Sequence, residues 1–118
     1  GFIGEWLHRA TAAVPGVLDH TDTVTHEDIL RAGAAELERR RPHMAAFTHA
    51  YRNTTHHAFS TEFVTRAVMY AGWHLLDRTL AAGSNSNRIG GSSRAAAGIG
   101  RQLLTLPAAF TEPLGLDI

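Results

Sequence analysis

Residues 62–82 read EFVTRAVMYAGWHLLDRTLAA, and this stretch decides the fold because apolar side chains recur through it at helical spacing. Ser60 and Thr61, followed by Glu62, form a good helix start, and Gly83 is expected to end the helix. A helix that is apolar most of the way round is central in a bundle or carries a subunit interface. The first apolar face consists of Val64, Ala67, Val68, Ala71 and Leu75, and the second of Met69, Tyr70, Trp73, Leu76 and Leu80.

Three helices are predicted before this stretch. Residues 2–14 form the first, which Pro15-Gly16 is expected to stop. The second begins at Thr25, whose hydroxyl can accept a backbone N–H, and ends at Arg39-Arg40-Arg41, where positive charge suits the helix dipole. The three arginines are interpreted as a solvated helix end, with a phosphate-facing patch as the alternative. The predicted buried face of this helix is Ile29, Leu30, Gly33, Ala34 and Leu37.

Pro42 fits the first turn of a further helix over residues 42–52, whose methionine-aromatic stripe is interpreted as core packing. The Gly-Ser-rich segment 83–93 predicts a flexible linker before a last helix over 94–106 and a docked or loose tail. Loops are expected at 18–24 and 53–59, and no alternating strand pattern is present. The sequence therefore predicts an all-α, up-and-down bundle of four or five helices. It forms a single domain over 1–118, with the C-terminal helix and tail in 94–118.

The composition narrows the function classes. The chain has 118 residues, which suits one domain, and it contains no cysteine, which removes disulfides and thiolate chemistry. All eleven basic residues are arginine and the net charge is zero, so any contact with nucleic acid requires a local patch. No apolar run approaches the length of about 18 residues that predicts a membrane span. We therefore expect a cytoplasmic protein with no membrane contact.

Eight histidines raise the question of a metal site. No two of them stand four residues apart, and His74 with Asp77 is a lone pair, so surface histidines are the better interpretation. No metal site and no cofactor is predicted. A histidine-based metal or haem protein, with His56 or His57 as haem ligand, stays open as an alternative.

The cluster RNTTHH at residues 52–57 is the stretch of the chain that most clearly indicates a specific chemistry. RNA cleavage by its own 2′-hydroxyl needs proton transfer and positive charge on the phosphate. Histidine titrates in the useful range, and arginine holds phosphate through two donors. Arg52 at a helix end and His57 just past it are expected on one side of a turn that Asn53 fixes. The competing interpretation is a helix-capping arginine followed by two surface histidines.

Arg-Asn followed by three residues and a histidine resembles the Arg-X4–6-His motif of the HEPN superfamily. The resemblance covers about thirty residues, RNTTHHAFSTEFVTRAVMYAGWHLLDRTL. It implies a metal-independent endoribonuclease, or a catalytically inactive relative, of a bacterial toxin–antitoxin or phage-defence system. It further implies an RNA substrate, an antitoxin protein as partner and a homodimer, with the second apolar face of 62–82 as the dimer seam. Arg52 would hold the scissile phosphate, His57 would transfer the proton, and Asn53 would orient them; His56 is the poorer match.

A non-enzymatic alternative rests on a different stretch. ELERRRPHMAAFTHAY at 36–51, together with the later helices, looks like the C-terminal half of tetracycline-repressor-type regulators. That resemblance implies a helical dimerisation or ligand-sensing domain without a DNA-binding unit. A cavity lined by Trp6, Phe47, Tyr51 and Trp73, with no polar cluster at its mouth, would favour it.

Overall fold

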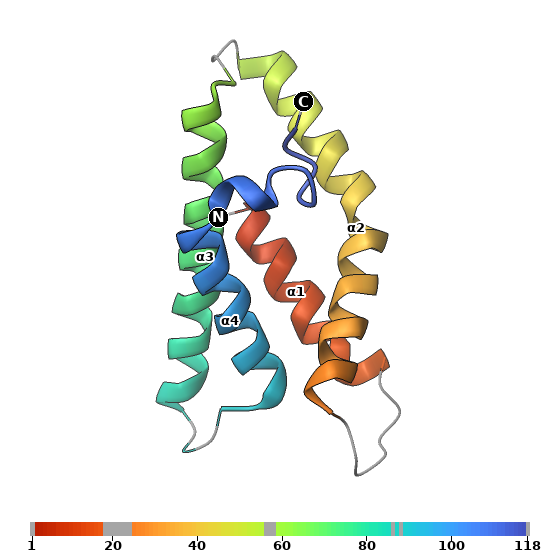
Figure 1. The fold of residues 1–118 in the computed structure, drawn as a ribbon, viewed down its shortest axis with the longest axis vertical. Coiled ribbons are helices and arrows are strands. Elements are labelled where there is room, and N and C mark those ends of the chain that lie inside the picture. Colours follow the sequence, from red (N-terminus) through yellow and green to blue (C-terminus); the bar gives the residue numbers. More distant parts are fainter. Residues whose placement is uncertain (1, 18–24, 56–58, 86, 88, 118) are drawn as a thin grey trace.

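The computed structural model describes residues 2–17, 25–55, 59–85, 87 and 89–117. Within these residues consecutive α-helices run in opposite directions along the bundle (Figure 1), and there is no strand. The predicted all-α, up-and-down bundle is confirmed, whereas the predicted loop at 18–24 lies outside the described residues. The elements are α1 (Phe2–Val17), α2 (His26–Thr55), α3 (Thr61–Ser84), α4 (Gly91–Thr105) and the 3₁₀ helix η1 (Pro107–Phe110).

Two predicted helix starts are confirmed by their hydrogen bonds. The Thr25 hydroxyl accepts the Asp28 N–H at 3.1 Å, and the Asp28 carboxylate accepts the Thr25 N–H at 2.9 Å. This reciprocal pair is a capping box, and it satisfies two backbone donors at the start of α2. The Ser60 hydroxyl accepts the Phe63 N–H at 3.1 Å and caps α3 in the same way.

The predicted break between Arg41 and Pro42 is wrong, because α2 is one helix of 30 residues that passes through Pro42. A proline inside a helix removes one backbone hydrogen bond and bends the axis. Burial of Met44, two residues after the proline, opposes this loss, and α2 leans toward α3 in its second half (Figure 1). α1 likewise continues past Pro15 to Val17, since a proline in the last turn removes only one hydrogen bond.

α4 begins at Gly91, three residues earlier than the predicted start at Arg94. Gly90 has the extended backbone of a helix N-cap, and the Thr79 hydroxyl of α3 donates to the Ser93 carbonyl at 3.3 Å. The last part of the predicted linker is therefore helical because it docks on the end of α3. α3 itself ends at Ser84, one residue beyond the predicted Gly83.

The predicted core face of α3 is confirmed. Val68 and Leu75 have no exposed surface, and Val64 and Ala71 are also buried. α3 packs mainly against α4 and α1, whereas α1 and α4 each contact all three other helices. The remaining members of the core cluster come from the other helices and the C-terminal segment, namely Leu7, Met44, Ala96, Leu103, Leu114 and Leu116.

The predicted buried face in the first half of α2 is only partly right. Three of its five residues are half-buried, and one of them, Leu37, packs against the core cluster. Leu30 and Ala34 are exposed, whereas Ala32, which lies outside the predicted face, is buried. α2 packs against α1 along one side, with few contacts to α4. α2 lies at the edge of the bundle and has one main neighbour, so it buries only a narrow stripe. The broad face expected from apolar spacing is therefore covered only in part.

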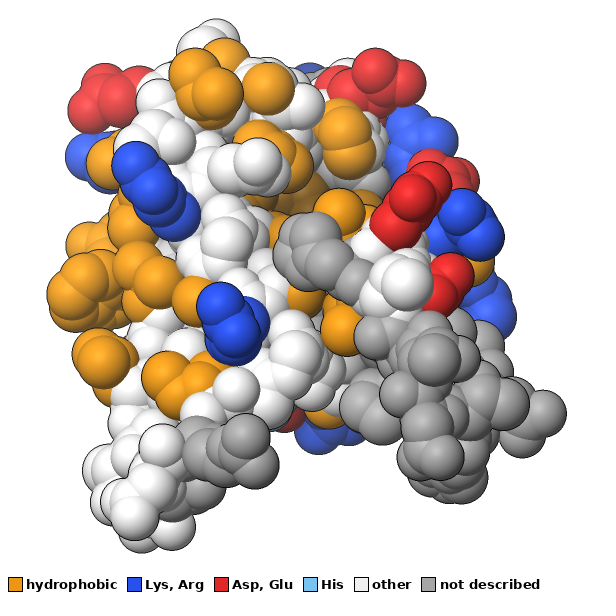
Figure 2. All heavy atoms as spheres, turned by 60° about the horizontal axis from the view of Figure 1, so that its bottom comes forward, with side chains coloured by type: hydrophobic (Ala, Val, Ile, Leu, Met, Phe, Trp, Pro, Cys, Tyr) orange, Lys and Arg blue, Asp and Glu red, His pale blue; other side chains and the backbone are white. Residues whose placement is uncertain are grey.

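The second apolar face of α3 lies on the surface. Tyr70 and Trp73 keep 67% and 61% of their surface exposed, and Leu80 is equally open. A shallow hollow of about 400 Å³ runs between Trp73 and Leu104 of α4. Figure 2 shows hydrophobic side chains gathered at its left-hand edge, the side on which α3 lies in Figure 1. One face of α3 is thus packed in the core, and the opposite face has no partner among the described residues.

The C-terminal segment after α4 is docked. The Leu116 N–H donates to the Thr111 carbonyl at 2.8 Å and the Gly115 N–H to the Glu112 carbonyl at 2.9 Å. These two bonds form a Schellman motif, in which Gly115 takes the left-handed conformation at φ 68°. The turn places Leu114 and Leu116 in the core.

Candidate functional site

A groove opens at one end of the bundle because the helices differ in length. α2 has 30 residues and α3 has 24, whereas α1 has 16 and α4 has 15. At a rise of about 1.5 Å per residue, α2 is about 20 Å longer than α1. α2 and α3 therefore continue past the point where α1 begins and α4 ends, and only the C-terminal segment approaches this end (Figure 1).

The groove has a volume of about 540 Å³ and is lined mostly by aromatic and aliphatic side chains. Its rings form a connected series. Phe2 stacks on Phe47 with centroids 4.0 Å apart, Phe47 neighbours Tyr51 at 6.1 Å, and Tyr51 lies parallel to Phe63 at 6.3 Å. Phe59 closes the series against Phe63 at 5.0 Å. Such ring pairs hold their geometry, so the groove has a preformed aromatic wall.

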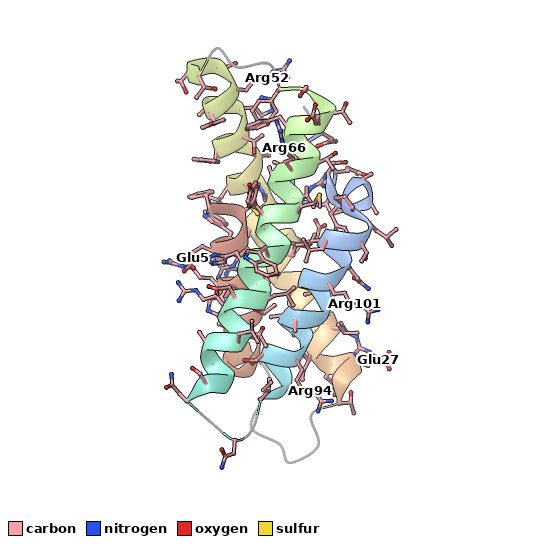
Figure 3. The ribbon with its side chains drawn as sticks, turned by 90° about the vertical axis from the view of Figure 1, so that its left-hand side faces the viewer. Glu5, Glu27, Arg52, Arg66, Arg94 and Arg101 are labelled. Atoms are coloured by element: carbon pink, nitrogen blue, oxygen red, sulfur yellow. The ribbon has the colours of Figure 1, made fainter. Side chains whose placement is uncertain are left out.

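Few polar groups face this groove. Thr48 is buried, and its hydroxyl donates to the Met44 carbonyl at 2.8 Å, which leaves only its lone pairs free. Arg66, from the second turn of α3, is the one charged residue among the described lining residues. Figure 3 shows Arg66 and Arg52 toward the same end of the molecule.

The structure places only part of the predicted RNTTHH site. Arg52 and Asn53 are exposed in the last turn of α2, and neither lines the groove. The predicted bend at 53–59 begins later than expected, since α2 continues to Thr55, whose hydroxyl donates to the Tyr51 carbonyl at 2.8 Å. Asn53 is therefore helical, and the turn that it is expected to fix falls on residues outside the described part of the chain. His56 and His57 lie outside the described residues, so the Arg52–His57 geometry stays a prediction.

The arginine run at 39–41 lies in the middle of α2 rather than at a helix end. Arg39 and Arg40 contact Glu36 at 2.7 and 3.3 Å, and Arg41 contacts Glu112 at 3.6 Å. The Arg39 hydrogen bond lowers the pKa of Glu36, so this carboxylate stays ionised beside the run. Each of the three arginines has a carboxylate partner, which weakens the alternative of a phosphate-facing patch.

A second polar cluster joins α1 to α3 around Glu5. Its carboxylate accepts from Arg9 Nε at 3.0 Å and lies 3.3 Å from His74 Nε2 and 3.7 Å from Arg78. The Arg9 hydrogen bond, followed by that of His74, lowers the pKa of Glu5. In the part of the chain that the structure describes, no three histidine or acidic side chains come together as a metal site would need.

The sequence predicted part of this groove and missed the rest. Phe47 and Tyr51 line it as the ligand-sensing alternative requires, but Trp6 and Trp73 do not. Trp73 faces the exposed hollow, and Trp6 packs 5.8 Å from the His43 ring. The missed lining residues are Phe2, Phe59 and Phe63, which come from three different segments of the chain. Their only signal in the sequence is aromatic type, which does not show which segments meet.

No family model matches the chain, and a search of curated proteins finds no significant match. Among the described residues, no helix combines the length and the apolar character that crossing a membrane requires. The residues that form the groove are therefore the basis for assigning a function.

Proposed function

We propose that this domain binds a small, largely apolar molecule in the groove between α1, α2, α3 and the C-terminal segment, as a ligand-sensing module. The observation that carries this proposal is the open volume of about 540 Å³ along a connected series of aromatic rings. Protein interiors are close-packed, and small-molecule sites commonly measure about 300–1,000 Å³. A groove of this size, built from rigid rings, is suited to an occupant.

The lining favours binding over catalysis. No histidine, aspartate or glutamate is among the described residues that line the groove. General acid–base chemistry needs such a group within hydrogen-bond reach of the substrate. Phe47, by contrast, remains 40% exposed although it stacks on Phe2. Covering this ring with an apolar ligand removes apolar surface from water and supplies the driving force.

Binding of a fluorescent naphthalene derivative to the purified protein tests this proposal. Phe47→Ala is expected to weaken binding about tenfold, because it removes an exposed ring that contacts both Phe2 and Tyr51 in the wall. Leu30→Ala is the matched control, since Leu30 is a similarly exposed apolar residue of α2 outside the groove. A wild-type protein that binds no probe, or equal losses in both variants, would contradict the proposal.

A second candidate is the HEPN-like endoribonuclease, active or inactive, in a toxin–antitoxin or phage-defence setting. It is supported by the exposure of Arg52 and Asn53, which leaves both side chains accessible to an RNA phosphate. No ion pair joins Arg52 to another described residue. Its guanidinium donors are thus not occupied by a described carboxylate.

RNA cleavage measured without added metal tests this candidate. Arg52→Ala is expected to lose activity on the order of 100-fold, as removal of a donor to transition-state charge does. Arg94→Ala is the control, because Arg94 is an exposed arginine on α4 at a distance from the motif (Figure 3). RNA that remains intact with the wild-type protein, or equal activity of the Arg52→Ala variant, excludes catalysis by this motif.

The homodimer is also a proposal, and the exposed face of α3 supports it. Met69, Tyr70 and Trp73 form one apolar surface with Leu104 of α4. Contiguous apolar surface of this kind is typical of protein interfaces. We propose that a second copy of the chain covers this surface. In a two-fold dimer the same patch of each chain meets its counterpart, so one apolar patch per chain is enough to form the interface.

A further inference from the structure

One charged side chain distinguishes this groove from a purely apolar one and restricts the class of ligand that fits it. Of the twelve described lining residues, Arg66 carries the only formal charge, and no lining side chain is acidic. The remaining polar atoms belong to Thr48, Tyr51 and Tyr70. The groove is thus apolar along its wall and positive at one position.

Arg66 retains donors for a ligand. Its contact is with Glu62 at 3.3 Å, one helical turn away. The side chains of this pair are 61% and 77% exposed, and exposed ion pairs contribute little because water competes with them. A guanidinium has five N–H donors arranged to hold a carboxylate through two of them. A ligand carboxylate at the rim of the groove can therefore replace Glu62 as the partner of Arg66.

We propose that the groove selects molecules with an apolar body and one acidic group, with the body against the Phe47–Tyr51–Phe63 rings and the acid held by Arg66. This inference rests on the proposed ligand-binding function and adds the chemical class of the ligand. A cationic head group would meet repulsion from Arg66, and no described lining residue of the groove is acidic. A neutral ligand would gain at most an uncharged hydrogen bond from the guanidinium, which is weaker than a charge-assisted one.

Calorimetric titration with a matched pair of probes tests this inference. The probes are 2-naphthoate and 2-naphthamide, which share the ring system and differ in charge. The acid is expected to bind the wild-type protein at least tenfold more tightly than the amide, a difference typical of one charge-assisted contact. Arg66→Gln should abolish this preference by weakening acid binding much more than amide binding. Arg101→Gln, an exposed arginine of α4 outside the groove, should keep it (Figure 3).

The Glu62→Gln variant should change the affinity for the acid in the opposite direction to Arg66→Gln. It removes the carboxylate that competes for Arg66 and should tighten acid binding without changing amide binding. Equal affinity of the two probes for the wild-type protein would overturn the selection of acids while ligand binding itself stands. A preference that survives in Arg66→Gln would overturn the role of Arg66. Failure of both probes to bind would overturn the proposed function and this inference together.

Discussion

Gly72 of α3 and Gly100 of α4 lie against each other's backbone at the crossing of the two helices. A Cβ atom placed on Gly72 would lie 2.6 Å from the Gly100 carbonyl oxygen, and one on Gly100 would lie 2.8 Å from the Gly72 oxygen. Both residues are buried. The close approach of α3 and α4, which makes the largest helix contact of the bundle, therefore depends on the absence of a side chain at both positions.

Gly72→Ala is expected to lower the free energy of unfolding by about 1–3 kcal/mol, because the added methyl group forces the two helices apart. Gly98→Ala is the control on α4, since nothing lies within 4 Å of a Cβ at that position. Alanine favours the helix over glycine, so Gly98→Ala should raise stability by up to about 1 kcal/mol. Chemical denaturation measures both values. Destabilisation of equal size in the two variants would argue against the close crossing.

Gly115→Ala is expected to destabilise the docked C-terminal segment by about 1–2 kcal/mol, because alanine is strained in the left-handed conformation. A Cβ at this position would also lie 3.1 Å from the Ala45 backbone nitrogen of α2. Leu116 follows directly and lines the groove, so naphthalene binding should weaken in the same variant. Unchanged binding in the presence of a lowered melting temperature would show that the segment does not shape the groove.

Glu5→Gln is expected to destabilise the protein at neutral pH but not in acid. Contacts with Arg9 and His74 lower the pKa of Glu5 below its ordinary value of 4.5. Folding thus favours the ionised carboxylate, and the stabilisation is present above the unfolded pKa and lost as the pH falls through the folded pKa. The difference in unfolding midpoint between wild type and variant should therefore shrink as the pH falls below about 4.5.

The control for this prediction is Glu27→Gln. Glu27 pairs with Arg31 on its own helix, and both side chains are largely exposed, so little stability is lost at any pH. Figure 3 shows Glu5 and Glu27 at separate places on the surface. A wild-type advantage over Glu5→Gln that stays constant in acid would mean that the carboxylate charge does not hold α1 to α3.

Trp73→Glu is expected to convert a dimer into a monomer, because it places a charge at the centre of the exposed apolar face of α3. Light scattering over a dilution series measures the molecular mass. Leu30→Glu introduces the same charge at an exposed position of α2 away from this face and should leave the mass unchanged. A wild-type protein that is monomeric at every concentration would contradict the proposed homodimer.

Local sequence signals were most informative where a single helix supplies all the relevant contacts. The caps at Thr25 and Ser60 are examples, because a hydroxyl and a backbone N–H three residues apart meet within one turn. Proline signals were misleading at Pro15 and Pro42, because the loss of one backbone hydrogen bond did not end either helix. The buried side of α2 was predicted only in part, since apolar spacing does not show how many neighbours a helix has.

The all-α class and the two-sided apolar character of residues 62–82 were determined by the sequence alone, because helical periodicity is a local property. Only the tertiary structure decided that one side packs as the core and the other remains exposed. It also decided that Phe2, Phe47 and Phe63 meet in one groove beside Arg66. The physical reason is that the groove depends on unequal helix lengths and on the docked C-terminal segment, which bring distant residues together.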